Sequence, residues 1–144
     1  DADILMICTG TGAAPFRGFA HRRRRTWPNA AGQLLLIYGA RTPEELPFFQ
    51  FLQRYSQAEF RRELVFSRDV AGDREYVQDR LRRRSSEVMQ LLRRPKSHVY
   101  ICGLKGIEEG VDEAFIDIGR VSGIDWLASK AEMRAAGRYH VELY

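Results

Sequence analysis

Several features that would place a chain outside the ordinary globular class are missing from this sequence. Its longest purely apolar runs, such as residues 34–38, are far shorter than the ~20 residues that a membrane-spanning helix needs. No signal-peptide pattern opens the chain, and it contains no internal repeats and no linker-like segment. These absences argue against a membrane-spanning, secreted or repeat protein, and we expect a single soluble domain in the cytoplasm.

Cysteine is also scarce, since Cys8 and Cys102 are the only two. Both lie in apolar, strand-like runs, which suits a reducing compartment better than a disulfide framework. Neither belongs to a cluster with metal-ligand spacing, so we expect no metal site.

The 144 residues, 44% of them hydrophobic, suffice for one packed domain of ordinary size. The chain begins at Asp1 without a methionine and enters a core strand almost at once, so we expect a piece of a longer protein. The net charge is +4, and arginines cluster at residues 22–25, 61–62, 82–84 and 93–94. Such clusters favour an anionic partner, but no recognition motif accompanies them, so we expect no nucleic acid.

Residues 5–17 organise the rest of the chain, because they read as a buried strand, a tight turn and the start of a helix. Gly10 and Gly12 let the backbone lie against a ligand, and Pro15 suits the first turn of a helix. The positive end of that helix would form an anion site suited to a pyrophosphate. Pro15 replaces the third glycine of the dinucleotide fingerprint, and the Gly-Lys-Ser/Thr ending of a P-loop is missing. An ordinary strand-to-helix turn therefore stays open.

Strand and helix patterns alternate along the chain. The strand patterns cover residues 4–8, 33–38, 63–67, 98–102 and 139–144. The helix patterns cover residues 15–25, 43–55, 76–92, 107–121 and 125–136. Strands separated by helices pair in parallel through right-handed crossovers. The sequence therefore predicts an α/β, Rossmann-like fold: a doubly wound five-stranded parallel sheet, order 3-2-1-4-5, with helices on both faces.

Polar and glycine residues follow the carboxyl ends of four of these strands, at residues 9–12, 39–42, 67–68 and 103–106. In a doubly wound sheet, ligands bind outside the carboxyl ends of the strands. The four segments therefore predict one binding site at one edge of the sheet.

Six motifs stand out along the chain, at residues 8–17, 38–42, 67–68, 76–79, 101–106 and 141–144. Through these motifs the chain resembles the plant-type ferredoxin-NADP reductase family, over essentially all of that family's C-terminal NADP-binding domain. The resemblance implies that residues 1–144 are the NADP-binding domain of a flavoprotein whose FAD-binding barrel is absent from this chain. Residues 102–106 and 108–112 are also similar to the reductase components of benzoyl-CoA epoxidases.

The resemblance assigns cofactor-binding roles to residues at the strand ends: Thr9, Gly10, Thr11, Gly12, Pro15, Arg41, Ser67, Arg68, Arg74, Tyr76, Gln78, Gly103 and Leu104. Ser67, Arg68 and Arg74 match the family's clamp for the 2′-phosphate, a role that suits the planar fork of arginine. Asp69 would repel a phosphate if it turned inward. Tyr76 matches the tyrosine that stacks on adenine; its alternative is a core-facing residue that opens a helix.

An NAD-specific dehydrogenase is expected to carry an acidic residue for the ribose diol after its second strand. Here that position leads into Gly39-Ala40-Arg41, which favours NADP.

The resemblance also assigns catalytic positions to Cys102, Glu142 and Tyr144. Cys102 would position the nicotinamide ring without acting as a nucleophile, since hydride transfer needs alignment and no attack on carbon. Glu142 matches a carboxylate near the reaction centre, and Tyr144 an aromatic that covers the flavin. The alternatives are a core cysteine, an exposed strand-end glutamate and a frayed terminus.

The implied function is hydride transfer between NADPH and FAD, with electrons passing to a ferredoxin-like iron-sulfur protein, a fused iron-sulfur domain or an oxygenase component. We expect little catalysis from the chain without its FAD domain. The arginine clusters are then either solvated helix faces or a surface that steers an acidic electron carrier. A non-catalytic NADP sensor or scaffold, and a binder of phosphate-rich polymers, are the competing functions.

Overall fold

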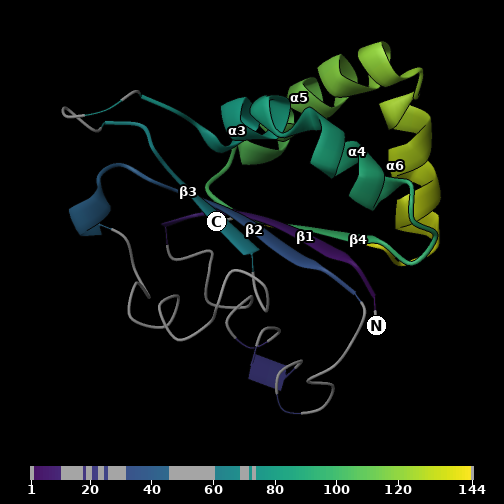
Figure 1. Ribbon diagram of the computed structural model, residues 1–144, viewed down its shortest axis with the longest axis horizontal. Coiled ribbons are helices and arrows are strands. Elements are labelled where there is room, and N and C mark those ends of the chain that lie inside the picture. Colours follow the sequence, from purple (N-terminus) through teal and green to yellow (C-terminus); the bar gives the residue numbers. More distant parts are fainter. Residues whose placement is uncertain are drawn as a thin grey trace.

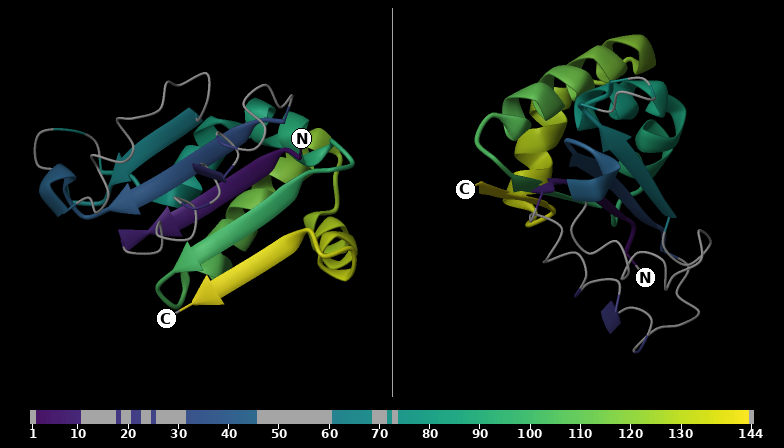
Figure 2. Two further views of the ribbon diagram at one scale, coloured as in Figure 1. Left: turned by 90° about the horizontal axis from the view of Figure 1, so that it is seen from below. Right: turned by 90° about the vertical axis from the view of Figure 1, so that its left-hand side faces the viewer.

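A computed structural model of the chain describes residues 2–10, 18, 21, 22, 25, 32–45, 61–68, 72 and 74–143. It contains five strands: β1 (Ile4–Thr9), β2 (Leu34–Ala40), β3 (Arg61–Phe66), β4 (His98–Gly103) and β5 (Tyr139–Leu143). All four neighbouring pairs are parallel, and the order is β3-β2-β1-β4-β5, as the left view of Figure 2 shows. The predicted fold class and strand order are therefore confirmed.

The helices of the described residues follow β3 and β4 along the chain. They are α3 (Val77–Arg83), α4 (Ser85–Leu92), α5 (Ile107–Ser122) and α6 (Trp126–Ala135). They cover one face of the sheet (Figure 1). Of the helix predicted at 15–25, residues 18, 21, 22 and 25 are described and are helical, and the rest lie outside the described residues. The helix predicted at 43–55 is described only for a 3-10 turn, η2 (Pro43–Glu45).

The single helix predicted at residues 76–92 is wrong, because the structure has two helices that meet at Arg84. Arg84 leaves helical geometry, with φ −103° and ψ 28°, and its Nε donates to both carboxylate oxygens of Glu63 on β3, at 2.6 and 2.9 Å. The buried residues Leu81 and Val88 are seven positions apart, which is the spacing of two helical turns. The apolar periodicity therefore carries no sign of the break.

The apolar core lies on both faces of the central strands. On β1, Leu5 and Ile7 pack against the helices, whereas Met6 and Cys8 belong to a second cluster on the opposite face. This alternation follows from the two-residue period of a strand. It also explains the continuous apolar runs in the sequence, which are typical of parallel strands buried on both sides.

The longest helix of the described residues, α5, has 16 residues and carries several charged side chains. Within the described part of the chain, no helix combines the length and the apolar character that crossing a bilayer requires.

Candidate functional site

A cleft of about 550 Å³ lies at the carboxyl ends of β1 to β4, which is within the range of small-molecule sites. Seven of the predicted site residues line it: Thr9, Gly10, Arg41, Ser67, Tyr76, Gln78 and Leu104. Parallel strands place their carboxyl ends at the same edge of the sheet, so segments up to 95 residues apart in sequence meet here. The structure thus brings together residues from all four predicted strand ends.

The tips of β2 and β3 are joined by two backbone hydrogen bonds beyond the end of the strands. The Ser67 N–H donates to the Ala40 carbonyl at 3.0 Å, and the Arg68 N–H donates to the Arg41 carbonyl at 2.8 Å. This pairing places Arg41 and Ser67 side by side in the cleft wall. Arg68 is exposed and follows Ser67 without lining the cleft itself.

The tip of β1 is fixed by contacts with β2 and β4. Gly10 has a φ of 55°, a left-handed conformation that favours glycine, and its carbonyl accepts a 2.5 Å hydrogen bond from the Tyr38 hydroxyl. Gly103 leaves the space that the Thr9 side chain occupies. The predicted residues Thr11, Gly12, Pro15 and Tyr144, and the neighbouring Asp69, lie outside the described residues.

The start of α3 presents an aromatic ring to the cleft. Tyr76 is 57% exposed, which excludes the core-facing alternative, and its backbone N–H donates to Asp79 Oδ2 at 2.9 Å. Gln78 is held against α5 because Gly110 has no Cβ; one there would lie 3.1 Å from Gln78 Nε2. Arg74, two residues before Tyr76, is exposed.

The opposite wall is the start of α5. Leu104, Lys105, Gly106 and Ile107 line the cleft, and Gly106 has a φ of 96°. The positive end of the α5 dipole therefore points toward the cleft, and Lys105 adds a formal charge. Both features favour an anionic ligand.

Cys102 and Glu142 are not among the residues that line the cleft. Strand register places Cys8, Cys102 and Glu142 in one row across β1, β4 and β5. Burial raises the pKa of Cys102, and the negative charge of Glu142 raises it further. The pKa of Cys8 is raised well above its ordinary value by burial and by Cys102. Both cysteines are free, and these shifts favour protonated thiols at neutral pH.

Eight residues of the cleft wall had no individual role assigned from the sequence: Gly39, Ala40, Glu45, Glu75, Val77, Lys105, Gly106 and Ile107. Four of them, Gly39, Ala40, Lys105 and Gly106, lie within the predicted strand-end segments. Glu75 and Val77 are direct neighbours of Tyr76, so their adjacency was the available signal. Gly39 has a further reason to be small, because a Cβ there would lie 3.0 Å from Val77 Cγ1 on α3. Glu75 is the unexpected one, since a carboxylate in an anion site needs a partner.

In the described part of the chain, the arginine clusters at residues 61–62, 82–84 and 93–94 are largely engaged in ion pairs with other elements. On α3, Arg80 and Arg83 pair with Glu75, and Arg82 pairs with Asp117 on α5. Other pairs join Arg61 to Glu87 on α4 and Arg84 to Glu63. These arginines therefore bind the helices to β3 and to each other, rather than only forming a solvated face.

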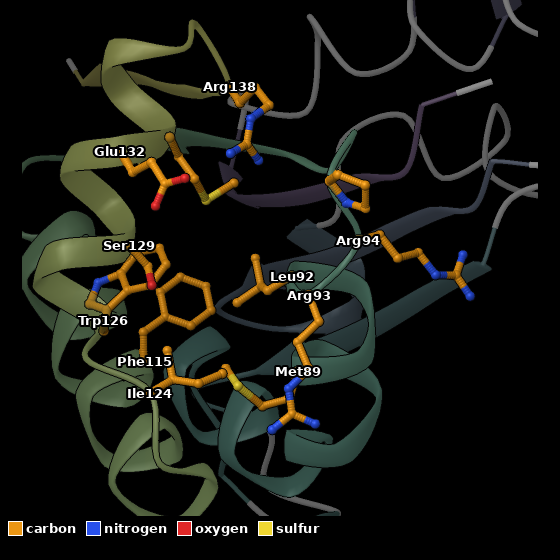
Figure 3. Close-up of a pocket in the computed structure, with 12 residues that line it drawn as sticks. Met89, Leu92, Arg93, Arg94, Phe115, Ile124, Trp126, Ser129, Glu132 and Arg138 are labelled. Carbon is orange, nitrogen blue, oxygen red and sulfur yellow. The ribbon is translucent and has the colours of Figure 1, made fainter.

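A second cavity, of about 200 Å³, lies between α4, α5 and α6 (Figure 3). Its wall includes Phe115 and Trp126, and its arginines have partners within the fold. Arg94 points away from the cavity and pairs with Asp3 Oδ1 at 2.8 Å, while Arg138 Nη1 donates to the Ser97 carbonyl at 3.0 Å. This cavity is below the range of about 300–1,000 Å³ typical of ligand sites, so the larger cleft is the candidate site.

The fold and the cleft define a nucleotide-binding α/β domain, and the sequence places it in a family. Residues 6–113, which run from β1 into α5, match the oxidoreductase NAD-binding domain. The chain belongs to this family.

Its relatives include ferredoxin-NADP reductases. The chain is 36% identical to the ferredoxin-NADP reductase of Synechocystis sp., in an alignment that covers all of this chain and 37% of that protein. It is 33% identical to the ferredoxin-NADP reductase of Spirulina sp., of which it covers 52%, and 30% identical to the chloroplastic enzyme of Spinacia oleracea, of which it covers 42%. The chain thus spans about half or less of the length of these relatives.

Proposed function

We propose that the cleft binds NADP(H), and that the protein to which the chain belongs is a flavoprotein oxidoreductase of the ferredoxin-NADP reductase type. The observation that carries this proposal is the meeting of Arg41, Ser67 and Tyr76 in one cleft at the carboxyl ends of the strands. A cationic group, a hydroxyl and an exposed aromatic ring are what a phosphorylated adenosine requires.

The state of the arginines supports a phosphate site. Within the described part of the chain, no ion pair occupies Arg41, Arg68 or Arg74, whereas Arg80 and Arg83 on the adjoining helix are paired with Glu75. Among the described residues, no carboxylate therefore competes with a ligand for the donors of these three arginines. Ser67, Arg68 and Arg74 would bind the 2′-phosphate, with Arg41 beside them, and Tyr76 would stack on the adenine.

The remaining predicted residues extend the same site. Gly10, Thr11, Gly12 and Pro15 would hold the pyrophosphate, together with Gly103 and Leu104. In this class of enzyme, the FAD accepts or returns the hydride of the nicotinamide. Cys102 would align the nicotinamide ring, Glu142 would hold or move a proton beside it, and Tyr144 would cover the flavin face.

The partner that follows from this function is an iron-sulfur protein. The relatives are named for ferredoxin. We propose that a ferredoxin-like protein or a fused iron-sulfur domain is the electron carrier. We also propose that the protein acts in the cytoplasm. We also propose an oxygenase component as the final acceptor, which the resemblance of residues 102–106 and 108–112 to the reductase components of benzoyl-CoA epoxidases would imply.

The direct test is a calorimetric titration of the chain with NADP and with NAD. NADP should bind at least about tenfold more tightly, because one charge-assisted phosphate contact contributes about 1.5–3 kcal/mol. Arg68→Ala should remove most of this preference, and Arg93→Ala, an exposed arginine at the end of α4, should leave it intact. Equal affinity for both nucleotides in the wild-type chain would overturn the proposal.

A second experiment separates an oxidoreductase from an NADP sensor or scaffold. The complete protein should be yellow from bound flavin and should reduce an artificial acceptor with NADPH. A colourless complete protein that binds NADP without diaphorase activity would favour the sensor.

A further inference from the structure

Glu75 lies in the sequence between Arg74 and Tyr76, two residues proposed to hold the adenosine half of the nucleotide. Its carboxylate is almost fully buried and is bound by arginines of α3. Arg80 donates to both of its oxygens, from Nε at 2.7 Å and from Nη2 at 2.9 Å, and Arg83 Nη1 donates at 2.8 Å. Such a bidentate, charge-assisted arrangement fixes the geometry of both partners.

Hydrogen bonds connect Glu75 to β3 at two points, through Arg80 and through its own backbone. Arg80 also donates from Nη1 to Glu63 Oε1 on β3 at 3.1 Å, and the Glu75 N–H donates to the Phe66 carbonyl at 3.0 Å. Phe66 is the last residue of β3 and directly precedes Ser67. The path from Glu63 through Arg80 and Glu75 to Phe66 therefore sets the distance between the end of β3 and the start of α3.

The ionisation of the pair agrees with this geometry. The hydrogen bond from Arg80, with the charges of Arg80 and Arg83, lowers the pKa of Glu75 despite its burial. The hydrogen bond to Glu75, with its charge and that of Glu63, raises the pKa of Arg80. Both groups are therefore charged at neutral pH.

Tyr76 and Arg74 differ in how they depend on this path. The Tyr76 N–H donates to Asp79, and its carbonyl accepts from the N–H groups of Asp79 and Arg80, so α3 itself anchors it. Arg74 has no such contact among the described residues, and its fixed neighbour is Glu75. Loosening Glu75 should therefore displace Arg74 more than Tyr76.

We propose that Glu75 is a positioning residue for NADP specificity: paired with Arg80 and Arg83, it holds Arg74 against the end of β3, opposite Ser67 and Arg68. This inference rests on the proposed binding of NADP in the cleft. In this role, the carboxylate of Glu75 contributes to the selection of the 2′-phosphate without contacting the phosphate.

Removing the charge of Glu75 tests the proposal, because the change in phosphate affinity has opposite signs for the two roles that this carboxylate could have. A carboxylate that lines the cleft repels a phosphate through space, so removing its charge would strengthen phosphate binding if nothing else changed. If the carboxylate acts by positioning Arg74, removing it weakens phosphate binding. The two roles predict opposite changes.

The experiment measures the affinity of the 144-residue chain for 2′,5′-adenosine bisphosphate and for 5′-AMP by calorimetry. Glu75→Gln removes the charge. Glu75→Asp keeps the charge, but its side chain is too short to accept hydrogen bonds from Arg80 and Arg83 at the same time. Glu87→Gln is the matched control. Glu87 lies on α4 and, like Glu75, pairs with an arginine; its partner is Arg61 on β3, the strand that also carries Glu63. Thermal unfolding verifies that each variant is folded.

We expect both Glu75 variants to bind the bisphosphate about threefold to tenfold more weakly, with 5′-AMP binding almost unchanged. Glu87→Gln should leave both affinities as they are. If Glu75→Gln does not fold, the bisphosphate affinity of Glu75→Asp alone tests the inference. Unchanged or stronger binding of the bisphosphate to the Glu75 variants would overturn the inference. A wild-type chain that does not prefer the bisphosphate over 5′-AMP would instead overturn the proposed function.

Discussion

Gly103 on β4 lies against the side chain of Thr9 on β1, so closely that a Cβ at position 103 would overlap the Thr9 hydroxyl oxygen. The same Cβ would lie 3.3 Å from Ile107 Cδ1 at the start of α5. The residue thus joins two strand tips and a helix start that form one side of the cleft. The two strand tips can lie this close because Gly103 has no side chain.

Gly103→Ala should therefore lower the free energy of unfolding by about 1–3 kcal/mol, the usual range for overpacking a close contact. It should also weaken nucleotide binding, because the tip of β1 must move. Urea unfolding and calorimetry measure the two effects.

A double-mutant cycle separates this contact from other consequences of the substitution. Thr9→Ala removes the overlapping oxygen, so Gly103→Ala should cost much less in the Thr9→Ala background than in the wild type. Equal costs in the two backgrounds would show that the contact between these residues does not limit position 103.

Tyr76 should contribute to adenine binding through its ring alone. Tyr76→Ala should weaken 5′-AMP binding by about 1–3 kcal/mol, the usual contribution of base stacking on an aromatic side chain, whereas Tyr76→Phe should bind almost as the wild type. Leu127→Ala is the control, since Leu127 on α6 is as exposed, at 58% against 57% for Tyr76. An equal loss in Tyr76→Phe would assign the effect to the hydroxyl group.

Much of the fold could be predicted from the sequence, because parallel strands buried on both faces leave continuous apolar runs. Every strand was found within two residues of its predicted ends. Ser67 and Leu104 could be placed at the site for a related reason: the topology alone brings the carboxyl ends of parallel strands together. Tyr76, which opens α3, was placed there only by the family resemblance.

The parts that could not be predicted depend on contacts between distant residues. Glu75 reads as an ordinary polar residue before a helix, and only the fold shows that Arg80 and Arg83 turn back to it. The break at Arg84 likewise coincides with a bond to a distant residue, Glu63, which lies 21 positions earlier on β3. Ion pairs of this kind leave no periodic pattern in a sequence.

The low pKa of Glu75 predicts how stability depends on pH. A carboxyl group whose pKa is lowered by folding stabilises the protein above its unfolded pKa, and this contribution is lost as the pH falls through the folded pKa. The ordinary value for Glu75 is 4.5. The free energy of unfolding should therefore fall as the pH drops below about 4.5, and more steeply in the wild type than in Glu75→Gln. Identical pH profiles from urea unfolding at each pH would contradict this.

Lys130 on α6 should be important for stability rather than for binding. Its Nζ lies 2.7 Å from Asp112 Oδ2 and 3.1 Å from Glu108 Oε1 on α5, and 5.2 Å from the centre of the Tyr139 ring. Lys130→Met leaves two partly buried carboxylates without this partner and should lower the free energy of unfolding by about 1–3 kcal/mol.

The matched control for Lys130 is Arg120→Met, which also removes a cation. Arg120 is highly exposed and approaches Asp117 only at 3.8 Å, so its loss should cost less than about 0.5 kcal/mol. Equal costs for the two variants would show that burial of the Lys130 cluster adds nothing.

Glu142 should control the ionisation of Cys102, its register partner on β4. Burial is the main cause of the raised pKa of Cys102, and the charge of Glu142 is the second. Glu142→Gln removes the second cause, so the thiol should ionise at a lower pH than in the wild type. The ultraviolet absorbance of the thiolate reports this in a Cys8→Ala background, where Cys102 is the remaining cysteine.

Glu113→Gln, an exposed glutamate on α5, is the control and should leave the midpoint of this titration unchanged. The result bears on the proposed role of Cys102, because a nucleophilic cysteine requires a thiolate near neutral pH. A thiol that ionises only well above neutral pH fits a residue that aligns a ring by contact. If Cys102 is already ionised near neutral pH, or if Glu142→Gln does not move its midpoint, that assignment of the Cys102 and Glu142 pair is wrong.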